Sequence, residues 1–437
     1  MDSLIANVTA VTMNEKMEVL FGAYLGITDG KIAYIGKTAP EEKPNTIIDG
    51  TGMVAIPGLI NCHTHLATSV LRNFVDDASK RDALMELLER QSKMDARAAK
   101  AATLLSIAEC LRFGVTSVSD LYLFPEVTAQ AAAETGIKAN VAMMTSRFVH
   151  ESEDFDFETD LQCQETVCLA EKWHGYDDGR IRVEVGLHAE CTSNYPLWEG
   201  LSAYAVEKGL RIHLHLAETA EEVADCQERT GMTPAELLNC HGMFTVPATA
   251  AGCAHLTDEE KTLLGKKKTS AVAMPIGAAK QGYDATPITD CVKAGMNVAL
   301  GTDSAVASGN LDMFEAMRFG ALQTRQSKGD SDGLPAAAAL MMATVCGATA
   351  QGRSGECGML KEGMDADIAL VDFSAPHLMP CHDVHSGLVF CAKGGDVAMT
   401  MVRGKILYQN GQFPTIDLKA VVSEIMEYAI PKIMGGK

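Results

Sequence analysis

The sequence predicts an α/β fold: a (β/α)8 TIM barrel joined to a small β-sandwich module formed from both termini. Two observations support this prediction. Short apolar runs alternate with helical stretches through the middle of the chain, whereas short strands alternate with turns near both ends. Strand–helix alternation indicates a parallel sheet. Eight such repeats over about 250 residues are typical of the barrel.

The two ends of the chain show the same sequence pattern. Residues 1–57 and 359–415 both contain short strand-like segments separated by turns such as Asp29-Gly30 and Asn410-Gly411. The expected strands are Leu4–Thr12, Val19–Thr28, Lys31–Ile35, Thr46–Asp49, Asp367–Val371, Ala398–Arg403 and Lys405–Tyr408. We expect the two segments to pair into one β module, and residues 416–437 to add a C-terminal helix.

Residues 58–358 are expected to form most of the barrel. Its strand candidates are near-continuous apolar runs, as buried parallel strands usually are. They are Val54–Asn61, Thr116–Leu121, Lys138–Met144, Ile181–Leu187, Arg211–Leu216, Ala248–Ala254, Thr269–Met274 and Asn297–Leu300. The expected helices include Arg97–Phe113, Thr159–Trp173, Pro196–Lys208, Ala220–Thr230, Ile288–Ala294, Leu311–Arg325 and Leu334–Ala350. An open doubly wound sheet is the alternative, but no Gly-x-Gly-x-x-Gly turn follows the first strand.

Composition argues against several classes of function. The 437 residues carry a net charge of −20, whereas nucleic acids and anionic membranes are bound through lysine and arginine. The 13 cysteines include no Cys-x-x-Cys pair, and the first residues lack the pattern of a signal peptide. No uncharged apolar run reaches the roughly 20 residues of a membrane span. We therefore expect a cytoplasmic protein with a small-molecule partner, and homo-oligomerisation stays open.

Two histidines at the end of the first barrel strand are the most informative local feature. His63 and His65 follow an apolar run, and side chains two residues apart on a strand point the same way. Paired imidazoles suit zinc, iron, copper or nickel. Because a His-x-His pair also occurs on ordinary surfaces, a metal site needs support from the rest of the chain.

Further reactive side chains follow other expected strands at the same end of the barrel. Barrel enzymes place their chemistry at the C-terminal ends of the strands. The residues found there are His188 after the fourth strand, His215 and Glu218 at the fifth, His255 after the sixth and Asp303 after the eighth. By contrast, His213 lies deeper in the fifth strand, and we interpret it as a packing histidine.

These residue types indicate a hydrolytic metal centre. Three imidazoles and one carboxylate can hold a divalent ion and leave a position for water. The expected ligands are His63, His65, His215 and Asp303. The ion lowers the pKa of that water toward about 7, so hydroxide becomes available at neutral pH. Glu218 can take the proton and pass it to a leaving group, while Asp303 can also orient the hydroxide.

At these positions the chain resembles the amidohydrolase superfamily, in the branch of 5-methylthioadenosine/S-adenosylhomocysteine deaminases and triazine chlorohydrolases. The similarity extends over nearly the whole chain, and its motifs are specific in combination. The matching segments are Pro57-Gly58-Leu59-Ile60-Asn61-Cys62-His63-Thr64-His65, Leu71-Arg72-Asn73-Phe74-Val75-Asp76-Asp77, His215-Leu216-Ala217-Glu218-Thr219, Leu300-Gly301-Thr302-Asp303-Ser304-Ala305, Asn310-Leu311-Asp312-Met313-Phe314-Glu315-Ala316-Met317-Arg318 and Gly363-Met364-Asp365-Ala366-Asp367-Ile368. The resemblance implies one zinc or iron ion on the same four ligands, Glu218 as proton shuttle and His188 as a substrate contact.

Two positions depart from the pattern of that branch. After the sixth strand such enzymes usually show Ala-His-Cys-Val-His-Leu; here Gly252 replaces the first histidine, and His255 matches the second. After the seventh strand the pattern Ser-His-Asn-Pro is replaced by Val272-Ala273-Met274-Pro275. The first histidine normally helps to orient water or substrate. That role is therefore either empty here or taken by another group.

The sequence predicts a metal-dependent hydrolytic deaminase that acts on an N-heteroaromatic, purine- or adenosine-like substrate through a metal-bound hydroxide. The expected cofactor is one divalent metal, Zn2+ in the first place and Fe2+ as the alternative. A related amidohydrolase that expels chloride or an amine, or opens a cyclic amide, is the alternative that Gly252 and Met274 favour. A binding protein that kept the fold and lost catalysis is a further alternative, and the intact ligands and Glu218 argue against it.

Overall fold

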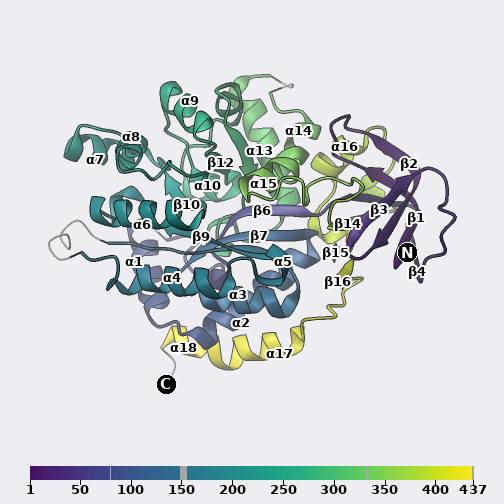
Figure 1. The fold of residues 1–437 in the computed structure, drawn as a ribbon, viewed down its shortest axis with the longest axis horizontal. Helices are drawn as coiled ribbons and strands as arrows, with labels where there is room; N and C mark the ends of the chain where they lie inside the picture. The colour runs from purple at the N-terminus through teal and green to yellow at the C-terminus, as the bar shows by residue number, and fades with distance from the viewer. Residues whose placement is uncertain (79, 148–154, 331–332, 436–437) are drawn as a thin grey trace.

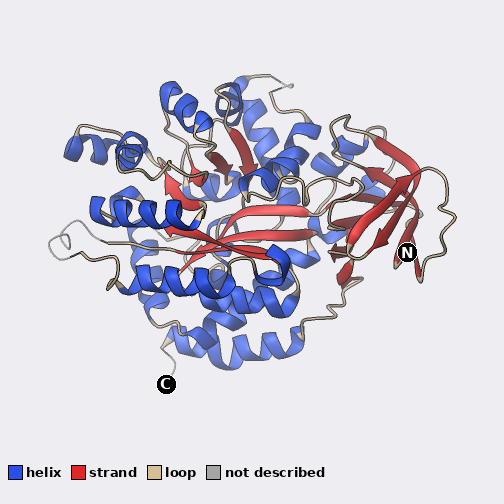
Figure 2. Cartoon of the chain, in the orientation of Figure 1, coloured by secondary structure: helices blue, strands red, loops and turns tan. Residues whose placement is uncertain are grey.

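Two eight-stranded sheets form the framework of the molecule. The computed structural model describes residues 1–78, 80–147, 155–330 and 333–435. Figure 1 shows a smaller sheet at the right, which contains the N-terminus, beside a larger body built around the second sheet. In Figure 2 helices surround the strands of this larger body.

Eight parallel strands form the barrel, and they follow one another in chain order. Their bounds are β6 Leu59–Thr64, β7 Val115–Tyr122, β8 Lys138–Met143, β9 Ile181–Leu187, β10 Ile212–Leu216, β11 Ala248–Gly252, β12 Ser270–Ala273 and β13 Asn297–Leu300. The first and last strands meet at a bridge between Thr64 and Asp303, and the side chain of Asn61 exchanges two hydrogen bonds with Thr302. The predicted (β/α)8 barrel is confirmed.

Helices connect the barrel strands. Their bounds are α1 Lys80–Ser92, α2 Ala96–Arg112, α3 Pro125–Thr135, α4 Leu161–Trp173, α5 Tyr176–Gly179, α6 Tyr195–Lys208, α7 Ala220–Thr230, α8 Pro234–Cys240, α9 Asp258–Lys266, α10 Pro275–Gln281, α11 Ile288–Lys293, α12 Ala305–Ser308, α13 Met313–Lys328, α14 Ala336–Met342 and α15 Val345–Ala350, with short 3-10 turns η1 Leu66–Leu71 and η3 Glu190–Thr192. Helix α6 illustrates the local signals. Asn194 caps its first turn, Pro196 lies inside that turn, and Gly209 ends it in the left-handed region.

The prediction of one helix over Leu334–Ala350 was wrong, because two helices, α14 and α15, occupy this stretch. The chain leaves helical geometry at Thr344, where φ is −133° and ψ is −89°. The break lets α15 pack against the barrel, where a Cβ on Gly347 would lie 2.8 Å from Cβ of Ile60. Packing against the barrel therefore overrides the helical pattern of the sequence.

Residues after α15 seal the N-terminal end of the barrel. The side chain of Gln351 bonds to the hydroxyls of Ser117 and Ser119 on β7. Arg353 is fully buried and donates to the carbonyl of Ala139 and to the side chain of Asn140 on β8. The barrel interior thus has a polar floor that lies opposite the strand ends carrying the predicted site.

The second sheet is built from both ends of the chain, in the order β16-β15-β14-β5-β1-β2-β3, with β4 beside β1. Its strands are β1 Ser3–Val11, β2 Val19–Thr28, β3 Lys31–Gly36, β4 Thr46–Asp49, β5 Met53–Pro57, β14 Ile368–Asp372, β15 Val397–Val402 and β16 Lys405–Gln409. Antiparallel pairing of β5 with β14 joins the N-terminal strands to the C-terminal ones. The expected module from both termini is therefore present as one hydrogen-bonded sheet.

The prediction of a single strand over Val54–Asn61 was wrong. This apolar run contains β5, which belongs to the terminal sheet, and β6, which opens the barrel. Gly58 separates them: its N–H donates to the carbonyl of Asp367, and a Cβ there would lie 2.2 Å from Thr116. An apolar run predicts burial, but it does not show which sheet buries it.

Helical segments complete the C-terminal part of the chain. They are η4 Pro376–Leu378, α16 Val384–Ser386, η5 Gly387–Cys391, η6 Gly394–Asp396, α17 Leu418–Glu424, η7 Ile425–Ala429 and α18 Ile430–Met434. Figure 1 shows α17 and α18 along the lower edge of the barrel, where α17 lies against α2 and α18 lies against α1. The final two residues of the helix expected over 416–437 lie outside the described residues.

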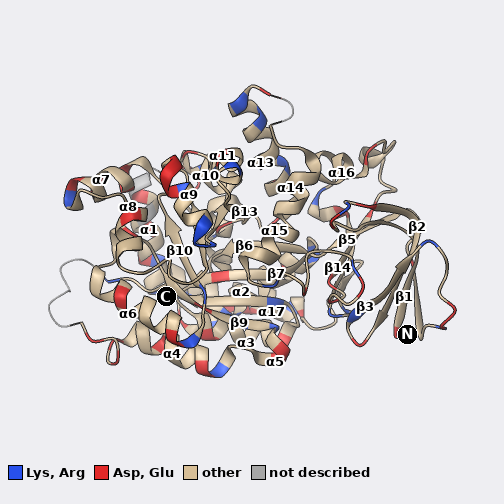
Figure 3. Cartoon of the chain, turned by 45° about the horizontal axis from the view of Figure 1, so that its top comes forward, with Lys and Arg blue, Asp and Glu red and all other residues tan. Residues whose placement is uncertain are grey.

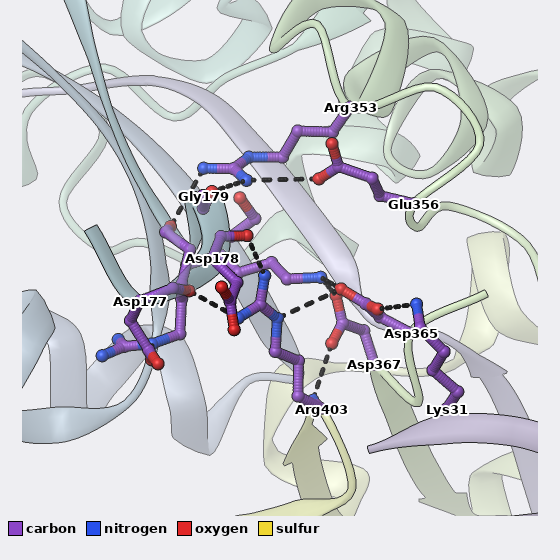
Figure 4. Close-up of polar contacts among 12 residues, drawn as sticks. Lys31, Asp177, Asp178, Gly179, Arg353, Glu356, Asp365, Asp367 and Arg403 are labelled. Atoms are coloured by element: carbon purple, nitrogen blue, oxygen red, sulfur yellow. Dashed lines mark hydrogen bonds and ion pairs between the residues drawn. The ribbon is translucent and has the colours of Figure 1, made fainter. Parts of the chain in front are cut away.

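A buried ionic cluster joins the terminal sheet to the barrel (Figure 4). Lys138 of β8 is fully buried and forms ion pairs with Asp365 and Asp367. Lys31 and Arg403 from the terminal sheet also contact Asp365, at 2.9 and 3.2 Å. Burial alone would raise the pKa of Asp365, but the charge of Lys138 and its hydrogen bond, with help from Lys31, lower it to about 2. The aspartate therefore stays ionised and holds cations from both parts of the molecule.

The outer surface carries both signs of charge. In Figure 3 basic and acidic residues are interspersed over the outer helices. All 13 cysteines are free thiols. Throughout the described ranges, no helix has both the length and the apolar character needed to cross a bilayer.

Candidate metal centre

Four of the predicted site residues converge at the C-terminal ends of the barrel strands. His63 belongs to β6, His65 follows it directly, and His215 belongs to β10. The three imidazole centroids are 4.7 to 5.4 Å apart, and the candidate ligand atoms of the three histidines lie within 4.8 Å of one another. Asp303 lies three residues beyond β13, with Oδ1 at 3.3 Å from Nε2 of His65.

Unusual backbone geometry follows three of the barrel strands at this end. Ala217, Cys253 and Asp303, which follow β10, β11 and β13, have φ values of 47°, 57° and 62°. Left-handed residues other than glycine cost about 1–3 kcal/mol each, and they cluster at functional sites. At Asp303 the N–H donates to the carbonyl of His63, and Oδ1 accepts from the N–H of Ser304. These two bonds fix the carboxylate beside the histidines.

Hydrogen bonds to backbone carbonyls define the tautomers of His65 and His215. Nδ1 of His65 bonds to the carbonyl of Leu121, and Nδ1 of His215 bonds to the carbonyl of His188. Because carbonyl oxygens only accept, both Nδ1 atoms carry the proton and both Nε2 atoms keep a lone pair. Nε2 of His63 is buried without a hydrogen-bond partner among the described residues, while its Nδ1 bonds to another side chain.

Burial keeps the three histidines neutral. It lowers the pKa of His63 and His215 well below the ordinary value, and neighbouring imidazoles lower both further. It lowers the pKa of His65 to about 4. Neutral imidazole is the form that binds metal ions, so these side chains need no deprotonation at neutral pH.

Two carboxyl groups beside the histidines have pKa values near neutral pH. Burial raises the pKa of Glu218 to about 8, and the charges of Asp303 and Glu222 contribute in the same direction. Burial raises the pKa of Asp303 to about 7, against a lowering hydrogen bond from the N–H of Ser304. The N–H of Glu218 donates to Oε2 of Glu222 at 2.8 Å, which fixes the loop that carries it. A carboxyl group with such a pKa can both accept and donate a proton.

This donor set fits one divalent metal ion. Three neutral imidazole nitrogens and one carboxylate form a set that zinc and iron accept. A buried nitrogen without a partner, such as Nε2 of His63, costs free energy until a ligand satisfies it.

The other two predicted histidines differ in their surroundings. His188 follows β9 directly, and its ring centroid lies 5.3 Å from that of His215. Its Nδ1 bonds to the hydroxyl of Thr192 at 2.7 Å. His255 instead has Nε2 at 3.3 Å from the exposed carboxylate of Asp284. The structure thus brings His188, but not His255, into contact with the three-histidine cluster.

The space beside Gly252 is occupied by Glu218. Gly252 has a φ of +94°, and a Cβ there would lie 3.0 Å from Cβ and 3.2 Å from Cα of Glu218. Thr286 donates to its carbonyl at 2.6 Å, which holds the backbone in place. The glycine is therefore what allows the Glu218 backbone to lie against β11. Ala273, the last residue of β12, and Met274, which follows it, are buried.

Sequence reasoning missed two residues of the site. His213, interpreted as a packing histidine, is fully buried but bonds to Nδ1 of His63 at 2.9 Å. Asp120 on β7 accepts the N–H of Leu66 and the hydroxyl of Thr64, so it fixes the turn that carries His65. The signals that could have found them are an aspartate inside an apolar strand and a second His-x-His pair at residues 213 and 215.

The chain is similar to known proteins in sequence and in fold. A model described as "Amidohydrolase family" matches residues 54–407. The 5-methylthioadenosine/S-adenosylhomocysteine deaminase of Thermoanaerobacter pseudethanolicus is 35% identical over 430 residues, which cover 98% of this chain and 99% of that protein. A zinc-bound adenosine deaminase structure from Xanthomonas campestris has a TM-score of 0.92 at 27% identity, with 99% of each chain covered. The zinc complex of an atrazine chlorohydrolase from Arthrobacter aurescens has a TM-score of 0.90 at 24% identity, over 98% and 100% of the chains, and supports the fold alone.

The family match covers most of the chain, and the deaminase relative covers nearly all of it. Together they indicate a hydrolase that acts on carbon–nitrogen bonds. The histidine cluster at the barrel ends is compatible with a divalent metal in such an enzyme. This chain belongs to the amidohydrolase family.

Proposed function

We propose that this protein is a metal-dependent hydrolytic deaminase of purine-like heteroaromatic amines, with adenosine-like compounds as the first substrates to test. One observation carries the proposal: the imidazoles of His63, His65 and His215 meet the carboxylate of Asp303 at one end of the barrel. The names of the relatives support the substrate class. One is a 5-methylthioadenosine/S-adenosylhomocysteine deaminase, and another is an adenosine deaminase.

The same four residues are proposed to hold one divalent ion, Zn2+ in the first place and Fe2+ as the alternative. When bound, the ion supplies Lewis-acid chemistry that lowers the pKa of water toward about 7. Zinc is supported by its presence in the Xanthomonas campestris structure and by the nitrogen-rich donor set.

Glu218 is proposed to carry the proton. In the reaction, water adds to the ring carbon that bears the amino group, and that carbon–nitrogen bond breaks. The products are ammonia and a ring carbonyl beside a protonated ring nitrogen. Of the two protons of the water, one must therefore move to the departing nitrogen and the other to the ring nitrogen. A pKa of about 8, raised by burial first and by Asp303 second, suits a group that takes and returns a proton near neutral pH.

His188 is proposed to contact the substrate. The hydroxyl of Thr192 donates to the carbonyl of Ala189 and therefore accepts from Nδ1 of His188. We assign the proton of this imidazole to Nδ1 on that basis, which leaves Nε2 as a hydrogen-bond acceptor. An acceptor beside the metal ligands suits an N–H group of a heteroaromatic substrate.

A second candidate function is hydrolysis with another leaving group. The ends of β11 and β12 favour it, because Gly252, the last residue of β11, has no side chain and Met274, directly after β12, offers no strong hydrogen bond. The same four ligands and Glu218 would serve a substrate that loses chloride or an amine, or whose cyclic amide opens.

Two measurements on the purified protein test these proposals together. Metal content is determined first, and ammonia release is then followed across adenosine-like nucleosides, free purines and chlorinated triazines. Bound metal with ammonia release supports deamination, whereas turnover without ammonia supports the second candidate. Bound metal without turnover of any compound would contradict both.

A matched pair of variants tests the proton shuttle. Glu218→Gln removes the titrating group and keeps the shape, so we expect kcat to fall about 100-fold or more with unchanged metal content. Glu221→Gln makes the same chemical change at an exposed position on α7 and should behave like the wild type. Unchanged turnover of Glu218→Gln would exclude the proposed role.

A further inference from the structure

A second layer of side chains lies directly behind one of the three histidines. Nδ1 of His63 bonds to Nε2 of His213 at 2.9 Å, and the two ring centroids are 5.1 Å apart. His213 is fully buried on β10, two residues before His215. His65 and His215 differ from His63, since their Nδ1 atoms bond to backbone carbonyls.

A buried carboxylate lies on the far side of His213. Oε2 of Glu184, on β9, lies 3.3 Å from Nδ1 of His213, and neither atom has a hydrogen-bond partner among the described residues. The other carboxylate oxygen accepts from Asn140 at 2.9 Å, and Nε of Arg211 lies 3.6 Å away. Glu184 is only 1% exposed, yet His213, Arg211 and Asn140 hold its pKa below the ordinary value against the raising effect of burial.

The proton positions on His213 and His63 follow from the ionised carboxylate of Glu184. A carboxylate offers only lone pairs, so the proton of His213 is favoured on Nδ1, the ring nitrogen that lies 3.3 Å from Glu184. In neutral His213, Nε2 is then an acceptor, and Nδ1 of His63 carries the proton between the two rings. This leaves a lone pair on Nε2 of His63, the buried atom without a partner in the ligand cluster.

We propose that His213 and Glu184 are positioning residues that fix the tautomer and ring orientation of His63 and increase its affinity for the metal ion. This inference rests on the proposed function, in which His63 is a ligand. A carboxylate behind a metal-bound histidine raises the basicity of the ligand, and loss of such a partner typically costs 10–100-fold in metal affinity. Here the carboxylate acts through an intervening imidazole.

Two substitutions at one position separate positioning from packing. Glutamine places an amide oxygen near the position of Nε2, so His213→Gln can still accept from His63. Asparagine reaches only about as far as Nδ1, so His213→Asn keeps the contact with Glu184 and loses that with His63. Thr249→Val is the matched control, because Thr249 pairs with His213 in the sheet, is buried and donates to the carbonyl of Ala350.

The assay is zinc affinity, measured by competition with a chromophoric chelator after the full-length protein has been stripped and reloaded. The unfolding midpoints of the metal-free proteins are measured in parallel. We expect His213→Asn to bind zinc about 10–100-fold more weakly, His213→Gln to lose distinctly less, and Thr249→Val to match the wild type. Glu184→Gln provides a second variant. This variant keeps a hydrogen-bond acceptor but removes the negative charge. Its zinc affinity should fall less than that of His213→Asn.

Several outcomes would overturn the inference. The first is a zinc affinity at the wild-type level in both His213→Asn and Glu184→Gln. Equal losses in His213→Gln and His213→Asn that follow the stability of the metal-free proteins would indicate packing alone. A wild-type protein that binds no zinc would instead overturn the proposed function, and this inference with it. The cobalt-loaded proteins give a spectroscopic check, since a reoriented His63 changes the visible absorption of Co2+ whereas a packing defect leaves it unchanged.

Discussion

Gly252 offers the sharpest test of how the site is built. Replacement by alanine adds one methyl group at a backbone φ of +94°, in contact with Cβ and Cα of Glu218. Both contacts are to the first atoms of the residue rather than to a mobile side-chain end. The methyl group therefore cannot be accommodated by a rotamer change, and the Glu218 backbone must shift by a few tenths of an ångström.

The expected magnitudes follow from these two effects. A left-handed conformation at a residue with a Cβ costs about 1–3 kcal/mol of folding free energy. Because a displacement of about 1 Å at a catalytic group costs about 100-fold in rate, a shift of a fraction of that distance should lower kcat about 10-fold. Metal content should stay at the wild-type level, since none of the atoms in contact belongs to a proposed ligand.

Gly295→Ala is the matched control, because Gly295 has a φ of +89° and an added Cβ there meets nothing within 4 Å. We expect both variants to lose similar unfolding free energy in urea, while only Gly252→Ala loses kcat. In the background of Glu218→Gln, Gly252→Ala should cost little further activity, since its effect passes through Glu218. Equal kcat values for the two glycine variants, or a full additional 10-fold loss in that background, would refute this reasoning.

Three further predictions concern the ionic cluster and the metal ion. Lys138→Met should lower the free energy of unfolding by about 3–5 kcal/mol, because two buried carboxylates lose their shared cation; a loss below 1 kcal/mol in urea unfolding would contradict this. The pKa of Asp365 is lowered from 3.8 to about 2, so its contribution to stability is present above pH 4 and is lost as the pH falls through 2. After allowance for partial solvent screening this contribution is about 1 kcal/mol, and the stability gap between wild type and Asp365→Asn should narrow between pH 6 and pH 2.5. Removal of the metal by a chelator should abolish turnover and lower the unfolding midpoint, and Zn2+ should restore both; undiminished turnover of fully stripped protein would exclude a metal-dependent reaction.

The sequence predicted the fold and the candidate ligands because both depend on local patterns. Alternation of apolar runs with helices identifies a parallel barrel, and the barrel then places every strand end on one face. His63 and Asp303 lie 240 residues apart in the chain, yet each could be assigned to that face from its own strand alone. No knowledge of their mutual contact was needed.

The missed features depend on contacts between distant strands. The bond between His63 and His213 requires the side chains of β6 and β10 to meet across the barrel interior, which no local pattern reveals. The role of Gly252 was missed for the same reason. The sequence shows only that a side chain is absent there, whereas the structure shows that Glu218 lies where a side chain would be. The division of one apolar run at Gly58 likewise depends on Thr116 and Asp367.

Because the terminal sheet is built from both ends of the chain, it can be completed only late in synthesis. Strand β5 leaves the ribosome about 300 residues before its partner β14, a delay on the order of 15–60 s at typical rates of synthesis. During this time β5 lacks the strand that pairs with its outer edge, and Lys138 has neither of its aspartates. Nascent chains that end between residues 304 and 364 should therefore engage chaperones and resist proteolysis poorly, although every proposed metal ligand has already been synthesised.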